Sequence, residues 1–326
     1  MNRMGGQKLL LPHRRQTIYG FLKAGAAAML FLLILWAVPR FLPLPGPPAA
    51  TSRIRAGLLY RYIAVNSVAD LTAALQRYSL LEVGDGEVVT PVLFNRFPPD
   101  FIKVLPVSRR KKLFFHTLLP IALIVGREIT LERGVLLHIL SKYPQPNEII
   151  FQKKDSGWQE RLTDAEIRQA LNLAKKYKSN RASELLKKIR PVPVSLILSQ
   201  SAIESAWGSS RFARDGNNIF GIWTWNDADD GLVPRLREKG KTHRVKSFKS
   251  LFAAVRGYSL ILNSQPAYDY FRELRQITND PEIMAAGLKK YSGRGGLYVR
   301  DVQNMIRRNR LRRYDSLKLR DVANND

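Results

Sequence analysis

A single carboxylate, Glu204, ends an apolar stretch of the chain and is followed closely by Trp207 and Gly208. Pro193 suits the first turn of a helix, where no N–H is needed, and the residues after it are apolar enough to bury most of that helix. We therefore expect Glu204 near the C-terminal end of a largely buried helix. Burial raises the pKa of a carboxyl group, as a general acid working near neutral pH requires. The alternative is a structural ion pair with a nearby Arg.

The segment after this helix combines turn-forming amides with aromatic residues. Asn217 and Asn218 can hold a tight turn through their side chains, and Phe220-Gly221 lets the backbone pass close beneath a cleft. Aromatic faces also stack on sugar rings, although core packing is the commoner role of a Trp. We favour Trp225 for a cleft, because a polar, turn-like run follows it.

Several motifs together resemble the glucosaminidase domain of peptidoglycan hydrolases, family 73 of the glycoside hydrolases. They are A-I-E-S-A-W-G-S-S, N-N-I-F-G-I-W, the helix of Tyr258 and the closing L-K-K-Y-S-G-R-G-G-L-Y. The resemblance covers about residues 190–310. It implies a lysozyme-like helical domain with a small β-hairpin lobe and an endo-β-N-acetylglucosaminidase that cuts peptidoglycan glycan strands. Glu204 would be its general acid.

The resemblance also assigns roles to further residues. A second catalytic carboxylate is expected on the hairpin lobe, where Glu238 is the nearest match, and Tyr291 would orient the substrate or stabilise developing charge. Phe248 stands where the family often has Tyr. The residues expected to bind substrate are Trp207, Asn218, Phe220, Trp225 and Tyr258.

Other chemistries stay open at this point. Asp215, Asp227, Asp229 and Asp230 are eligible as the second carboxylate, and assistance by the substrate's 2-acetamido group would need none of them. The same fold and acid would also suit a lytic transglycosylase. A non-catalytic, membrane-anchored protein that binds peptidoglycan is a further alternative.

Composition and charge restrict the partners. The 326 residues carry 53 Lys and Arg against 27 Asp and Glu, a formal charge of +26, which predicts an anionic partner. No nucleic-acid-binding signature occurs, so we expect no nucleic acid. The chain has no Cys and four scattered His, so we expect neither a metal site nor another cofactor. We expect a monomer.

An apolar run at residues 24–38 predicts a membrane segment. It is preceded by five basic residues and no acidic one, and a Pro-rich stretch follows it. The positive-inside rule then predicts a cytoplasmic N-terminus, with the remainder of the chain across the membrane. Together with the resemblance to peptidoglycan hydrolases, this implies a single-pass protein of the bacterial inner membrane with its catalytic domain in the periplasm. A cleaved signal peptide is the alternative.

Periodicity and turn signals predict a mainly α (α+β) protein with a small N-terminal α/β region after the membrane segment. We expect helices at residues 67–78, 108–142, 163–177, 250–262 and from 280, with either a kink or a break at Pro120. Strands are expected at residues 87–94, 232–236 and 244–248, the last two as a hairpin. The expected regions are a cytoplasmic N-terminus (1–23), a transmembrane signal-anchor (24–39), a linker (40–52), an accessory region (53–107), a helical region (108–190), the catalytic domain (191–310) and a basic, polar tail (311–326).

Overall fold

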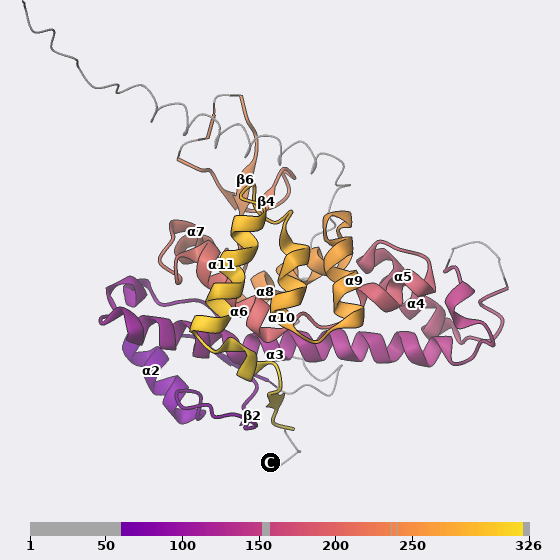
Figure 1. Ribbon diagram of the computed structural model, residues 1–326, viewed down its shortest axis with the longest axis horizontal. Helices are drawn as coiled ribbons and strands as arrows, with labels where there is room; N and C mark the ends of the chain where they lie inside the picture. The colour runs from indigo at the N-terminus through magenta and orange to yellow at the C-terminus, as the bar shows by residue number, and fades with distance from the viewer. Residues whose placement is uncertain (1–59, 152–156, 236, 239, 322–326) are drawn as a thin grey trace, which may run out of the picture.

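The computed structural model describes residues 60–151, 157–235, 237–238 and 240–321 (Figure 1). Within these residues the protein is mainly helical, with three small sheets, as the sequence predicts. The expected membrane segment at 24–39 and the linker at 40–52 lie outside the described residues.

The accessory region is a small α/β unit, and a strand near the C-terminus of the chain pairs with it. Its elements are β1 (Arg61–Ile63), α2 (Val68–Arg77), β2 (Val88–Val89), β3 (Val92–Phe94) and the 3₁₀ helix η3 (Pro99–Lys103). Ser67 begins α2 with the capping box that polar helix starts favour. Strands β1 and β3 pair in parallel, and β2 pairs in parallel with β7 (Lys318–Leu319). The C-terminal segment is therefore part of the support for this region.

The helix α3 (Val107–Leu140) is the longest described element, and in Figure 1 it runs horizontally, with α8, α9 and α10 above it and α2 below one end. It continues through Pro120, so the chain has one helix here and not two. By length and hydropathy α3 could cross a bilayer, but 78% of its most apolar window is buried inside the protein. It packs against α6 and α8, which makes it the core helix of the fold.

Shorter helices build a layer on α3. They are α4 (Asp164–Tyr177), α5 (Ala182–Lys188), α6 (Val194–Ser205), α7 (Arg211–Gly216), α8 (Leu251–Ser264), α9 (Asp269–Ile277), α10 (Pro281–Met284) and α11 (Gly296–Arg308), with the 3₁₀ helices η4 (Pro146–Glu148), η5 (Pro266–Tyr268), η6 (Ala285–Leu288) and η7 (Leu311–Tyr314). Thr163 and Glu166 form the predicted capping box of α4.

The helix α6 is buried almost all round because it lies between α3, α11 and η7. Its apolar composition on every face is what a helix in the centre of a domain requires. Asp315 binds its first turn, accepting from the backbone N–H and the hydroxyl of Ser195 at 2.8 and 2.7 Å. The sequence correctly predicts this buried helix and its start after Pro193.

A small sheet stands at the opposite side of the helical layer from α3 (Figure 1). It consists of β4 (Trp223–Thr224), β5 (Gly231–Leu232) and β6 (Arg244–Lys246), with β6 in the centre. The predicted hairpin is present as β5 and β6, paired antiparallel, but its strands are shorter than expected. The sequence analysis did not predict β4, whose two residues are too few for a periodic signal.

Candidate active site

The end of α6 places Glu204 at a sharp turn of the chain. Ala206, Trp207 and Gly208 all have positive φ, and Ala206 caps the helix in the left-handed conformation. At Gly208 a Cβ would lie 3.3–3.4 Å from the rings of Phe97, Phe101 and Phe114, so the absence of a side chain lets the turn lie against the accessory region. The turn thereby fixes Glu204 in the last turn of a rigid, buried helix.

The carboxyl group of Glu204 lies directly against the backbone at Gly221. A Cβ built at Gly221 would be 3.5 Å from Oε2 of Glu204, and Gly221 has φ of +64°. Asn218 holds this passage: its Oδ1 accepts from the N–H groups of Phe220 and Ile222, and its Nδ2 donates to two carbonyl groups. The predicted close approach of the backbone is therefore present, with the Glu204 carboxyl on it.

A chain of buried hydrogen bonds leads to Glu204. The Tyr258 hydroxyl donates to Oε1 of Gln200, and Nε2 of Gln200 donates to the Tyr298 hydroxyl at 2.8 Å. Because Tyr298 accepts from an amide, its own hydrogen is available for the Glu204 carboxyl, with which it makes a hydrogen bond. Helices α8, α6 and α11 each supply one or two members of this chain, so the fold as a whole orients Glu204.

The electrostatic environment of Glu204 favours a protonated carboxyl group. Burial raises the pKa of Glu204, and the hydrogen bond from Tyr298 and the charge of Arg294 offset part of that rise. Burial also raises the pKa of each surrounding tyrosine, and the nearby Glu204 charge contributes to the effect. The tyrosines therefore stay neutral donors beside the acid.

Tyr291 closes the site on the side of the loop before α11. Its hydroxyl donates to the carbonyl of Phe220 at 2.8 Å, and its ring stacks on Tyr298 with centroids 5.6 Å apart. Phe220 in turn stacks on Tyr258 at 4.1 Å, and both rings are buried. Phe220 and Tyr258 thus position the site from within the core, and Tyr291 holds the backbone that faces Glu204.

The tryptophans divide into two environments. Trp207 lies edge-on to Phe114 and Phe115, and the Lys111 ammonium is 4.6 Å from its ring. Trp223 and Trp225 project from the sheet, 39% and 40% exposed, with their rings stacked at 6.5 Å. The two exposed rings form an aromatic surface of the kind that binds sugars.

The carboxylates of the lobe differ from Glu204 in their surroundings. Glu238 is exposed in the loop between β5 and β6, and Asp215 is exposed on α7. Asp229 is engaged: it accepts from the Thr224 hydroxyl at 2.6 Å and pairs with Lys246 at 2.8 Å. Asp229 therefore stabilises the lobe itself.

Asp227 and Asp230 are also exposed. Asp227 lies 3.8 Å from the Arg244 guanidinium. Among the described residues, the charged group that acts on the Glu204 carboxyl is Arg294, which is a cation.

Sequence analysis missed three members of the site, Gln200, Tyr298 and Tyr268. Gln200 lies one helical turn before Glu204, so its i, i+4 spacing was a usable signal. Tyr298 lies in the closing sequence motif, but after the polar loop that made Tyr291 a candidate. Tyr268 approaches Tyr291, with centroids 6.1 Å apart, only through the tertiary fold.

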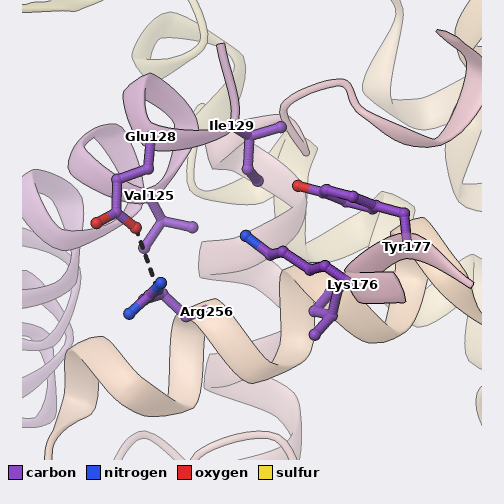
Figure 2. A pocket seen from close by; sticks show the side chains of 7 residues that line it. Val125, Glu128, Ile129, Lys176, Tyr177 and Arg256 are labelled. Carbon is purple, nitrogen blue, oxygen red and sulfur yellow. Dashed lines mark ion pairs between the residues drawn. The ribbon is translucent and has the colours of Figure 1, made fainter. Parts of the chain in front are cut away.

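A separate group of charged residues lines a small cavity between α3, α4 and α8 (Figure 2). Glu128 pairs with Arg256 at 3.1 Å, and burial raises the pKa of Glu128. Beside it, Lys176 and the Tyr177 hydroxyl each lie 2.5 Å from the Glu132 carboxylate. These polar groups pair with one another and join three helices, so their role is structural.

Comparison with known proteins agrees with this geometry. Residues 179–311 match the glucosaminidase family, described as mannosyl-glycoprotein endo-beta-N-acetylglucosaminidase. The matched region contains α6, the small sheet and α11, and the resemblance to this family that the sequence motifs indicate is confirmed.

Individual relatives extend the comparison. Protein bax of Escherichia coli strain K12 is 29% identical over 214 residues, which are 61% of this chain and 70% of that protein. The sequence motifs described above also indicate a likeness to Bax-type proteins, and this match confirms it. Among solved structures, the catalytic domain of the autolysin Auto from Listeria monocytogenes matches with a TM-score of 0.31 and 20% identity, covering 50% of this chain and 91% of that domain.

Because folding raises the pKa of Glu204, ionisation of Glu204 should lower the free energy of unfolding as the pH rises. A carboxyl whose pKa is raised by folding stabilises the protein while protonated, and this contribution is lost as pH rises through the folded-state pKa. We expect Glu204→Gln to gain stability relative to the natural protein from about pH 4 upward, because Gln stays neutral. Urea unfolding at about pH 4 and about pH 8 measures the change. Glu273→Gln, at an exposed site on α9, is the control. An equal difference at both pH values would contradict the prediction.

Proposed function

We propose that this protein is a peptidoglycan hydrolase, an endo-β-N-acetylglucosaminidase that cleaves glycan strands with Glu204 as general acid. The observation that carries the proposal is the Glu204 carboxyl itself. Burial raises its pKa, Tyr298 orients it, and it faces the backbone at Gly221 in a domain of the glucosaminidase family. A group held in this way can deliver a proton at neutral pH.

In the proposed reaction, protonated Glu204 gives its proton to the oxygen of the scissile glycosidic bond. The C1–O bond then breaks, and positive charge develops at C1 and the ring oxygen. The Tyr298 hydroxyl favours this step, since its hydrogen bond stabilises the anion that Glu204 becomes. Trp223 and Trp225 support the proposal, because their exposed faces suit sugar rings.

The identity of the group that attacks C1 separates two mechanisms. A carboxylate of the lobe, with Glu238 as the sequence prediction, would attack or activate water. The exposure of Glu238 and the engagement of Asp229 favour the other mechanism, in which the substrate's 2-acetamido oxygen attacks C1. Lytic transglycosylation is the second candidate function, and the exposure of Glu238, Asp227 and Asp230 favours it in the same way.

Removal of the acid tests the first part of the proposal. Glu204→Gln keeps the size and polarity of the side chain but has no proton of suitable acidity, so release of muropeptides from purified sacculi should fall by about a hundredfold or more. Mass spectrometry of the products gives the rate and the type of end. Glu273→Gln is the matched control and should retain full activity. Near-normal release by a folded Glu204→Gln protein would reject Glu204 as the acid.

The lobe carboxylates are tested in two steps. A triple variant, Asp227→Asn, Asp230→Asn and Glu238→Gln, should lose less than about tenfold of its activity if the acetamido group attacks. Adding Asp229→Asn tests the remaining lobe carboxylate, with thermal melting to detect loss of its structural pairing. A loss as large as that of Glu204→Gln would instead assign a protein carboxylate. Anhydro-sugar ends in the natural enzyme's products would identify transglycosylation.

We also propose that residues 24–38 anchor the protein in the bacterial inner membrane with the catalytic domain in the periplasm. The basic residues before the apolar run, with no acidic residue among them, support this orientation. A fluorescent reporter that matures only in the cytoplasm, fused after residue 326, should give no signal. The same fusion lacking residues 24–38 should fluoresce. Strong fluorescence of the complete fusion would contradict the orientation.

A further inference from the structure

The loop before α3 exposes three apolar side chains in a short span. Ile102, Leu105 and Val107 are 36%, 71% and 45% exposed. The loop itself is held firmly, because Phe101 and Val104, between and beside them, are buried in the core. The three exposed apolar side chains therefore project from a well-packed backbone. Their exposure to water costs free energy unless another surface covers them.

Positive charge surrounds these apolar side chains. Residues 101–127 contain no Asp or Glu, and Lys103 and Arg109 are exposed among the apolar positions. Arg110 binds the loop by donating to the carbonyl of Ile102 at 3.0 Å. Apolar tips within a basic surround are the composition that binds the interface of an anionic membrane.

A hollow next to the loop extends the basic surface. It lies where α3 meets the accessory region and the segment after α11, and its cations are Lys111, Lys112 and Arg313. Glu82 is the one carboxylate that lines it, and this carboxylate pairs with Lys112. Ser108 adds a hydroxyl group to its lining. The hollow thus offers charge and hydrogen bonds to a phosphate headgroup beside the apolar loop.

We propose that this face, defined by the loop 102–109 and the adjacent hollow, docks on the surface of an anionic lipid bilayer. The apolar tips would enter the interface, and the cations would bind lipid phosphates. Charge complementarity selects the bilayer over a second copy of this chain, because two such faces would repel each other. Glu204 and its tyrosines take no part in the docking surface, although Lys111 of the hollow also lies over the ring of Trp207.

The length of the chain is compatible with this contact. Residues 39–59 separate the predicted membrane segment from Tyr60, and a chain of that length spans at most about 70 Å. The anchor would therefore keep the domain near the bilayer, and the docking face would decide which side of the domain rests on it.

The absence of Cys from the chain allows a direct test. Leu105→Cys in the full chain, carrying an environment-sensitive fluorophore, is mixed with vesicles of phosphatidylcholine alone or with added phosphatidylglycerol. We expect a blue shift, and quenching by nitroxide-labelled lipid, in the anionic vesicles only. Ile277→Cys, at an exposed apolar position at the end of α9, is the matched control and should stay water-like.

A charge variant separates docking from simple insertion of the anchor. In the Leu105→Cys background, Lys103→Glu with Arg109→Glu should abolish the blue shift while the protein still floats with the vesicles. A water-like label at position 105 in anionic vesicles would overturn the proposal. A blue shift of the label at position 105 in neutral vesicles, or of the label at position 277 in anionic vesicles, would also overturn it. So would a blue shift at position 105 in lipid-free detergent at rising protein concentration, because that would indicate self-association.

Discussion

The buried amide of Gln200 is the group on which the arrangement of the site depends. A buried amide must have its hydrogen bonds satisfied inside the protein, and here it accepts from Tyr258 and donates to Tyr298. This fixes which way the amide points, and so directs the Tyr298 hydrogen toward Glu204. Gln200 thereby links three helices that are far apart in the sequence, and through Tyr298 this link orients Glu204.

The rest of the fold packs around α6 and keeps it buried. The long helix α3 lies under it, α11 lies beside it, and Asp315 holds its first turn. At the other end, Gly208 allows the chain to turn against three phenylalanine rings. A carboxyl at the end of such a helix has little freedom to move into water, so desolvation can raise its pKa without unfolding the region.

The helical layer and the lobe divide the work of the proposed enzyme. The helical layer holds a desolvated acid among neutral tyrosines, whereas the lobe carries exposed carboxylates and the exposed Trp223 and Trp225. The two parts meet at Gly221, where the backbone faces Glu204 and Tyr291 holds the neighbouring carbonyl. In the proposed enzyme the acid therefore lies in the helical layer, and the exposed tryptophan rings lie in the lobe.

The sequence by itself determined the local features. Apolar periodicity located α2, a capping box located α4, the apolar stretch around Pro193 located α6, and the motif around Glu204 indicated the family, because these signals lie within one or two turns of the chain. The tertiary structure decided what the acid meets. Tyr298 and Tyr268 reach the site from elements far along the chain, and the lobe carboxylates, though close to Glu204 in sequence, are solvated or engaged elsewhere. Spacing along a chain does not fix such distances, since they depend on how buried helices pack.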